Sequence, residues 1–334
     1  MKVAIVHDDL VQWGGAERIL LGICEIFPEA PIFTSVLDLQ NENIRKNFGN
    51  KKIITSFLQK IPFWKTFYKS MLPLYPVGFE QFNFDDFDLV ISHTTRFAKS
   101  IITKPETKHI CYCHTPPRFL WHFSGVKNYG ILEMLMTKLR IYDQISANRT
   151  DEFIAGSENA KRRIKKIYRR DSKIIYPFID LDRFKNIETY DGGYFLVIGR
   201  PNRYKRFDLA INACRDLGYE LKIIAGDLND RMVLNILRGC TALIIPGEED
   251  FGLTSLEAQA LGKGVIAYRS GGSLETVIEG KTGFFFDAQT SDSLKLAIKK
   301  FEEVKINPQD CKDNVNRFSK EKFEQSFKII VASL

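Results

Sequence analysis

The sequence predicts an α/β protein with two halves of similar design, each a parallel sheet covered on both faces by helices. Three observations predict this fold class. Short β-branched runs alternate with segments of helical periodicity, as they do in parallel sheets. The alternation breaks once, between Pro177 and Gly193, where Pro, Asp, Asn and a pair of glycines show no period. A second alternating series then begins at Tyr194.

The elements of the first half follow from these patterns. Apolar residues from Ile19 to Phe27 recur at helical spacing. Ser157 is a typical cap for a helix that begins near Glu158. The predicted strands cover residues 3–6, 89–91, 109–113, 153–155 and 174–176.

The second half repeats the design. Helices are predicted to begin near Phe207 and to run from about Thr254 to Leu261. The predicted strands cover residues 194–199, 221–225, 243–245, 265–267 and 284–286.

Three segments divide the chain. We place an N-terminal domain at 1–180, a C-terminal domain at 181–315 and a helical segment at 316–334. In the last segment the apolar residues recur at helical spacing; they are Phe318, Phe323, Phe327 and Ile330.

Composition and charge exclude several classes. With 334 residues, of which 44% are hydrophobic, the chain can bury a core in each half. The net charge of +7 fits an anionic ligand or membrane surface and does not require nucleic acid. MKVAIVHDD is interpreted as a first strand, and no apolar run reaches the roughly 18 residues of a spanning helix. Six cysteines outside paired zinc spacings favour free thiols in a reducing cytoplasm.

The first candidate segment, HDDLVQWGGAERIL, puts Gly14 and Gly15 between a strand and a helix. Ligands of open α/β sheets bind beyond the carboxyl ends of the strands, so a cleft between the two sheets is the expected site. Glycines there let backbone amides and the helix dipole approach an anion. An ordinary tight turn remains an equal alternative.

The second segment, IGRPNRYKRFDLAI, concentrates cations at a strand end, among them Arg200 and Lys205. Arg binds phosphate oxygens in a bidentate manner and Lys adds a compact charge, which together suit a pyrophosphate. The alternative is a solvated basic loop.

The third segment, IIPGEEDFGLTSLEAQALGKGVIA, leads from a strand through an acidic turn into a helix. Seven residues separate Glu249 in the loop from Glu257 inside the helix. A carboxylate near phosphate is unfavourable unless it accepts hydrogen bonds from hydroxyls such as those of sugars and ribose. The alternative is a helix with glutamates near its N-terminus, where their negative charge interacts favourably with the helix dipole.

These motifs, together with YRSGGSLETVIEGKTGFFF and YCHTPPRFLWH, resemble family 4 of the retaining glycosyltransferases over nearly the whole chain. The resemblance implies the GT-B fold: two Rossmann-like domains with a cleft between them and a C-terminal helix that crosses back to the N-domain. Within the family the chain looks most like bacterial mannosyltransferases that build O-antigen and other surface polysaccharides from GDP-mannose.

The resemblance also implies roles for individual residues. Glu249 would contact hydroxyls of the donor sugar, Glu257 would bind the ribose, and Arg200 and Lys205 would bind the diphosphate. His114 would lie close to the reacting sugar. Other donor contacts would come from the glycine loop at Gly14 and Gly15 and from the turn formed by Phe251, Gly252 and Leu253.

One departure concerns the base-binding region. The chain between Gly226 and Thr241 is shorter than is usual in the family, by about one strand and one helix, so the base is left open.

Cysteines and acids that could suggest a metal have simpler interpretations. CYCH before Thr115 lacks a second ligand cluster. The Asp-x-Asp pattern of NFDDFDLV leads directly into a strand and is interpreted as a turn. No metal and no cofactor besides the nucleotide-sugar substrate is expected.

The resemblance implies a same-face mechanism. Fixed cations and amides, with Arg200 and Lys205 among them, would stabilise the leaving diphosphate in place of a divalent ion. No carboxylate stands out as a nucleophile for a double displacement, and the leaving phosphate would help to deprotonate the acceptor.

Lysines and aromatic residues interleave between Lys51 and Tyr75, a pattern that fits an interfacial segment on an anionic membrane. An amphipathic helical pair packed on the N-domain is the alternative, because Pro62 and Pro73 interrupt any long helix. We expect a lipid-linked or other glycan acceptor and a cytoplasmic protein that binds peripherally to the inner face of the membrane. A UDP-sugar-dependent enzyme, a nucleotide-sugar-binding protein without turnover and a phosphorylase remain alternatives; no motif supports the last.

Overall fold

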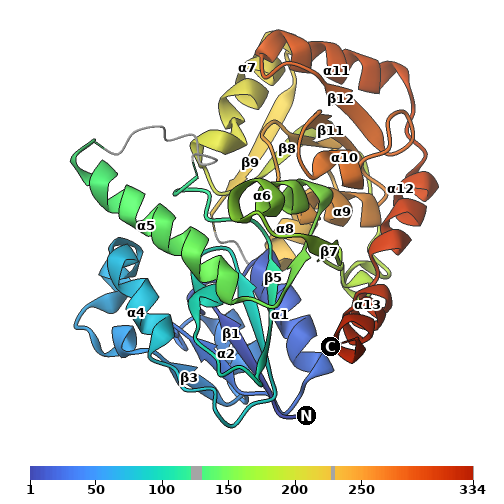
Figure 1. The fold of residues 1–334 in the computed structure, drawn as a ribbon. Helices are drawn as coiled ribbons and strands as arrows, with labels where there is room; N and C mark the ends of the chain where they lie inside the picture. The colour runs from blue at the N-terminus through green and yellow to red at the C-terminus, as the bar shows by residue number, and fades with distance from the viewer. Residues whose placement is uncertain (122–129, 227–229, 334) are drawn as a thin grey trace. The chain divides into compact units, whose positions relative to one another are not determined.

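The computed structural model describes residues 1–121, 130–226 and 230–333 (Figure 1). Contacts divide the chain into two compact units. The first contains Met1–Tyr176 and the end of the chain from Glu324, and the second is Pro177–Phe323.

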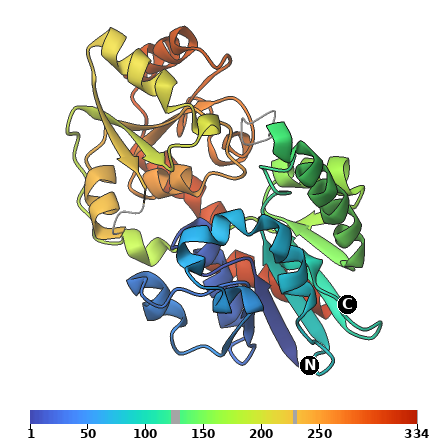
Figure 2. The same ribbon diagram turned by 90° about the vertical axis from the view of Figure 1, so that its left-hand side faces the viewer.

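Parallel strands form the sheet of the first unit, in the order β3-β2-β1-β4-β5-β6-β7 (Figure 2). Their bounds are β1 Val3–His7, β2 Ile32–Thr34, β3 Ile53–Thr55, β4 Leu89–Thr94, β5 Lys108–Cys113, β6 Glu152–Ala155 and β7 Ser172–Ile174. The predicted strands are all present. β7 lies two residues earlier than predicted, because β6 ends at Ala155, the register partner of Ile174.

The sequence analysis missed β2 and β3. Each is only three residues long, too short to show a period of its own. Because β3 lies inside the stretch from Lys51 to Tyr75, neither a continuous interfacial segment nor a helical pair describes that stretch fully. The rest of it consists of the short helical turns η1 Phe57–Lys60, α3 Trp64–Phe67, η2 Tyr68–Ser70 and η3 Leu72–Leu74.

Helices cover the first sheet. The α1 helix (Gly15–Ile26) begins at the glycine loop, and Ser157 Oγ caps α6 (Glu158–Tyr168) by accepting the N–H of Ala160 at 2.9 Å. One core cluster joins residues of β1, β2 and β4 to α4 (Tyr75–Glu80) and α5 (Glu133–Ser146). The remaining helical segments are α2 Glu42–Phe48, η4 Ala98–Ser100, η5 Gly130–Leu132 and η6 Ala147–Arg149.

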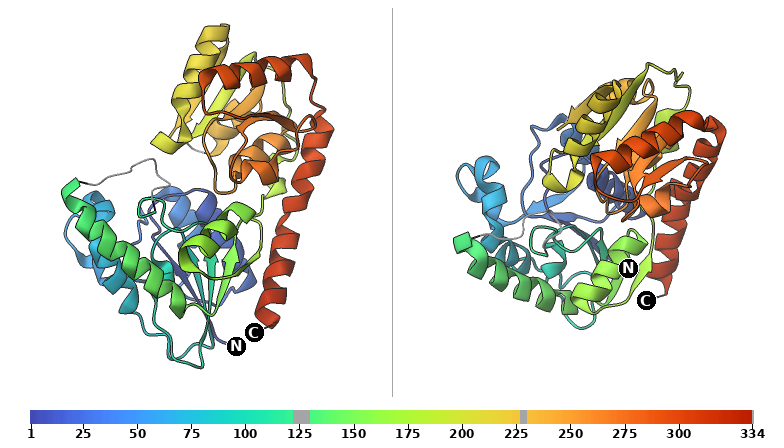
Figure 3. Two further views of the ribbon diagram at one scale, coloured as in Figure 1. Left: turned by 45° about the horizontal axis from the view of Figure 1, so that its top comes forward. Right: turned by 90° about the horizontal axis from the view of Figure 1, so that it is seen from above.

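The second unit has a parallel sheet in the order β12-β11-β10-β8-β9. Its strands, all close to the predicted positions, are β8 Tyr194–Gly199, β9 Glu220–Ala225, β10 Ala242–Ile245, β11 Gly264–Tyr268 and β12 Gly283–Phe286. Helices α7 (Phe207–Leu217) and α11 (Ser291–Glu303) lie side by side and share a core cluster with the sheet (Figure 3). The remaining helical segments are η7 Leu181–Phe184, η8 Arg203–Lys205, α8 Asp230–Leu237, α9 Leu253–Ala260, α10 Ser273–Thr276, α12 Pro308–Val315 and η9 Asn316–Phe318.

The edge strand β9 is followed along the chain by α8 and then by β10, on the other side of β8. This is the region for which the resemblance led us to expect a shorter chain than is usual. Residues 227–229 of that region lie outside the described residues.

The unit boundaries differ slightly from the domains drawn on the sequence. Phe178 and Ile179 belong to the second unit. The Phe178 ring packs on the Phe323 ring with centroids 5.0 Å apart, and the N–H of Ile179 donates to the carbonyl of Phe318. The predicted terminal segment 316–334 is therefore divided. Helix α13 (Lys320–Ala332) begins in the second unit, and its later residue Phe327 packs in the first unit against Phe27 and Tyr112.

All six cysteines are buried free thiols, as predicted. None of the helices in the described ranges is long and apolar enough to cross a membrane.

Candidate functional site

Two loops at the carboxyl end of the second sheet bring a predicted cation and a predicted carboxylate together. η8 follows β8, and the acidic loop follows β10. Lys205 Nζ donates a hydrogen bond to Glu249 Oε1. Their side chains are only 14% and 16% exposed, so this ion pair is well shielded from water.

Gly247 makes this approach possible. A Cβ there would lie 2.2 Å from the carbonyl oxygen of Tyr204 and 2.7 Å from the Cα of Lys205. Any side chain would therefore force the acidic loop away from η8. Arg200 is exposed at the first position after β8, and the Lys205–Glu249 pair forms without it.

The turn before α9 is fixed by glycines and by a buried aromatic side chain. Gly252 caps α9 with a φ of 98°, a left-handed conformation that favours glycine. Phe251 is buried and packs edge-on against Phe318 at 5.4 Å, so its side chain belongs to the core. Leu253 is the first residue of α9, whose N-terminus therefore adjoins Glu249 in sequence.

Glu257 has a separate cationic partner. Arg183 Nη1 lies 3.3 Å from Glu257 Oε1, and Arg183 Nη2 lies 3.5 Å from Asp230 Oδ2. Arg183 lies in η7, within the segment interpreted only as a linker, so the sequence analysis missed it. The sequence offered only a weak signal, because Arg183 stands in an otherwise aperiodic stretch, 74 residues before Glu257 in the chain.

In the first unit, the glycine loop lies at the carboxyl end of β1. Gly14 caps α1 with an extended backbone, and a Cβ on Gly14 would lie 3.2 Å from Glu17 Oε2. Glu17 is buried, and its Oε1 lies 4.0 Å from Nε2 of His7, the last residue of β1.

His114 follows β5 at the same edge of the first sheet. Its Nε2 lies 2.7 Å from Nε2 of His93, a buried residue of β4. Burial lowers the pKa of His93 well below the usual histidine value, and the nearby His114 and His7 act in the same direction. The sequence analysis named His114 but missed His93 and His7. The signal was a histidine at or just after the end of three predicted strands.

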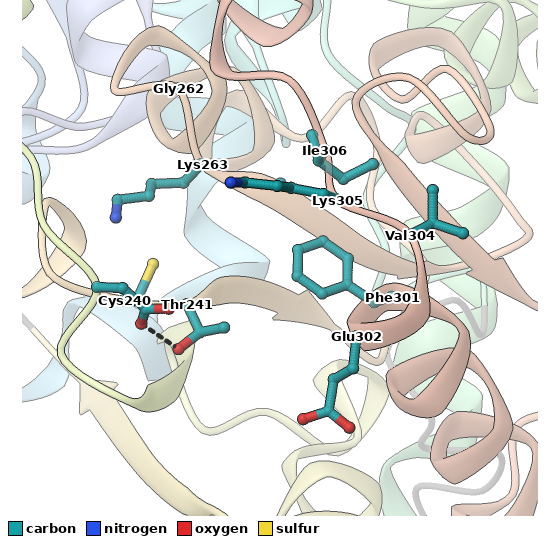
Figure 4. Close-up of a pocket in the computed structure, with 11 residues that line it drawn as sticks. Cys240, Thr241, Gly262, Lys263, Phe301, Glu302, Val304, Lys305 and Ile306 are labelled. Carbon is teal, nitrogen blue, oxygen red and sulfur yellow. Dashed lines mark hydrogen bonds between the residues drawn. The ribbon is translucent and has the colours of Figure 1, made fainter.

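A cavity of about 480 Å³ in the second unit lies at the opposite edge of its sheet (Figure 4). Thr241 and Gly264, at the amino ends of β10 and β11, line it. Lys263 also lines it and donates to the carbonyl of Tyr190 at 2.6 Å. None of the predicted site residues lines this cavity.

Two Rossmann-like units, each with a parallel sheet, give this chain the GT-B fold of glycosyltransferases. The model for Glycosyltransferase Family 4 matches residues 13–183, and that for Glycosyl transferases group 1 matches residues 223–318. The chain belongs to Glycosyltransferase Family 4.

Named mannosyltransferases are similar in sequence to this chain, and a solved structure shares its fold. The chain is 22% identical to alpha-1,3/1,6-mannosyltransferase ALG2 of Candida glabrata, with 98% of this chain and 92% of that protein covered. A segment is 46% identical to the GDP-mannose-dependent alpha-(1-6)-phosphatidylinositol monomannoside mannosyltransferase of Mycolicibacterium smegmatis, with 15% of this chain and 13% of that protein covered. The structure of Anabaena Alr3699/HepE in complex with UDP and glucose matches with a TM-score of 0.70 at 15% identity, and both chains are fully covered.

Proposed function

We propose that this glycosyltransferase moves mannose from GDP-mannose to a lipid-linked glycan of the cell surface, with retention of configuration and without a metal ion. The observation that carries the proposal is the pairing of the two motif glutamates with cations. Lys205 pairs with Glu249 in the loops at the carboxyl end of the second sheet, and Arg183 pairs with Glu257 in the α9 helix that follows. Such an arrangement offers acceptors for sugar and ribose hydroxyls beside cations for a diphosphate.

The leaving diphosphate accounts for the cations. As the bond between the sugar and the phosphate breaks, negative charge develops on the leaving oxygen. Lys205, Arg200 and the N-terminus of α9 supply fixed positive charge and amide donors for that oxygen. The same diphosphate would take the acceptor proton, so the acceptor would attack the face from which the leaving group departs.

Mannose is favoured by the relatives. Those in Candida glabrata and Mycolicibacterium smegmatis are named mannosyltransferases, and the second name specifies GDP-mannose and a phosphatidylinositol mannoside. The second candidate is a UDP-sugar-dependent enzyme, favoured by UDP and glucose in the HepE complex. The similarity to bacterial O-antigen enzymes in particular stays a prediction.

A donor screen separates the two candidates. Initial rates of nucleoside diphosphate release with GDP-mannose, UDP-glucose and UDP-galactose should show a clear preference for GDP-mannose. A preference for a UDP-sugar would replace the first candidate with the second. Stabilisation of the protein by a nucleotide sugar without any turnover would indicate a binding protein instead.

The proposed lipid-linked acceptor requires contact with a membrane. Phe63 and Phe67 are 79% and 53% exposed and lie near the exposed Lys60 and Lys69 in sequence, whereas Trp64 packs against the core of the first unit. Exposed rings with lysines next to them suit the headgroup region of an anionic bilayer. Flotation with anionic vesicles at low salt tests the contact, with the Phe63→Ser/Phe67→Ser variant as the control. Wild-type protein that stays at the bottom of the gradient would exclude it.

A further inference from the structure

Three histidines form a row across the carboxyl ends of neighbouring strands in the first unit. His7 ends β1, and its register partner on β4 is His93. The two Nδ1 atoms lie 3.0 Å apart. His93 Nε2 lies 2.7 Å from Nε2 of His114, just after β5. Both ring nitrogens of His93 therefore have a histidine as a hydrogen-bonding neighbour.

His93 is wholly buried, and its lowered pKa keeps it neutral at ordinary pH. A neutral imidazole carries one N–H, so it donates through one nitrogen and accepts through the other. Which nitrogen of His93 carries the hydrogen therefore depends on His7, and this determines in turn whether Nε2 of His114 accepts or donates.

The backbone sets the direction of the row. His7 Nδ1 also lies 3.2 Å from the carbonyl oxygen of His93, which can only accept a hydrogen bond. This contact favours a hydrogen on Nδ1 of His7. The conclusion does not depend on Nε2 of His7, the nitrogen that lies 4.0 Å from Oε1 of Glu17. Nδ1 of His93 then accepts, its Nε2–H donates to Nε2 of His114, and neutral His114 carries its own hydrogen on Nδ1.

Aromatic contacts hold these rings in place. The His93 ring stacks on Tyr112 with centroids 5.5 Å apart and meets the His114 ring edge-on at 4.5 Å. The Tyr112 hydroxyl donates to the carbonyl of Ile175 at 2.9 Å. The ring of His93 is therefore fixed in orientation as well as in hydrogen bonding.

We propose that His93 is a positioning residue for sugar transfer, which holds His114 through Nε2 and keeps the hydrogen of His114 on Nδ1. The inference rests on the proposed function, in which His114 lies beside the transferred sugar. An Nδ1–H suits the oxygen of a sugar hydroxyl.

The His93→Phe variant tests the proposal, because it keeps an aromatic ring against Tyr112 and removes both nitrogens. We expect kcat to fall roughly 10- to 100-fold, as for residues that orient metal-bound histidines, while the Kd of free GDP stays unchanged. The ¹⁵N NMR signals of the His114 ring, assigned with a His114→Ala variant, should show the hydrogen on Nδ1 in the wild type and a mixture of tautomers in His93→Phe. His93→Gln should restore part of kcat, since its amide both donates and accepts.

His109→Phe is the matched control. His109 is equally buried on β5, but its Nε2 contacts Ser92 Oγ at 2.8 Å and takes no part in the row. It should lower stability without changing kcat or the His114 tautomer. An equal loss of kcat in this control, or a wild-type hydrogen on Nε2 of His114, overturns the proposal, and the second measurement does not depend on the folding of any His93 variant. If instead His114→Ala keeps the wild-type kcat, the proposed role of His114 fails while the tautomer measurement still stands.

Discussion

Lys205 donates a hydrogen bond to Glu249, so the cation predicted for the donor diphosphate already neutralises the carboxylate predicted for the donor sugar. Both side chains are largely shielded from water. Removal of either one takes an oppositely charged neighbour from a charge that water solvates poorly, which costs more than the loss of a surface contact. The two residues should therefore be tested as a pair.

Glu249→Ala should lower sugar transfer by about 100-fold or more, if the carboxylate positions the reacting sugar. The Kd of free GDP should stay nearly normal, because Lys205 remains.

Lys205→Ala should lower kcat and donor affinity together, because its charge acts in the ground state and in the transition state. The double variant should bind GDP better than Lys205→Ala does, since the negative charge of Glu249 no longer repels the diphosphate. Calorimetric titrations and initial rates measure this, with the exposed Lys281→Ala as a control; wild-type transfer by Glu249→Ala would contradict the assignment.

Glu257→Ala should weaken the binding of GDP-mannose and of free GDP alike, by roughly 1 to 3 kcal/mol, as expected for charged hydrogen bonds to ribose. Arg183→Ala provides the comparison. It removes the partner of Glu257 at 3.3 Å but leaves the carboxylate, so the loss of affinity should be smaller. Titration of both nucleotides against both variants decides the matter. A larger effect of Arg183→Ala would show that the arginine, not Glu257, holds the nucleotide.

The sequence predicted most of the architecture because long alternating runs carry their own period. Strands such as β8 lie where they were expected, whereas β2 and β3 escaped because three residues show no period. The pairing of Lys205 with Glu249 could not be predicted, because it depends on how closely Gly247 lets two loops approach. The histidine row was missed for a similar reason, since only strand order and register place His7 beside His93.

Acid should weaken the first unit through Asp8. Burial alone would raise the pKa of the Asp8 carboxyl, but the Arg96 charge, His7 and backbone N–H donors such as those of Thr95 and Ala98 outweigh it, so the net pKa is lowered. A lowered pKa in the folded state adds stability above the unfolded-state value of about 3.9, and that stability is lost as the pH falls through the folded-state pKa.

Asp8→Asn should accordingly be less stable than the wild type at pH 7, and the difference should shrink as the pH falls below about 4. Urea midpoints across that range measure it. The exposed Asp86→Asn should show no comparable difference. A gap between wild type and Asp8→Asn that is constant with pH would contradict the lowered pKa.

A buried ion pair supports the helix α5. Lys99 and Asp143 are fully buried and paired, and Asp143 Oδ2 also accepts from Trp121 Nε1 at 2.8 Å and from the Tyr168 hydroxyl at 2.9 Å. Asp143→Ala should lower the free energy of unfolding by about 3 to 5 kcal/mol, because it leaves a buried ammonium without its partner. Lys99→Met/Asp143→Leu should recover much of that loss. Equal destabilisation of the single and double variants, measured in urea, would contradict this account.

Metal independence is the broadest chemical prediction. If Lys205, Arg200 and the α9 N-terminus neutralise the leaving diphosphate, they perform the task that a divalent ion performs in metal-dependent transferases. The initial rate should then be unchanged in excess EDTA and should not rise when magnesium or manganese is added.

The Lys205→Ala variant offers a sharper test of metal independence, because a divalent ion bound to the donor could replace the missing cation. Partial rescue of that variant by magnesium, with no effect on the wild type, is the expected result; wild-type activity that EDTA abolishes and magnesium restores would overturn the assignment of the leaving-group cations.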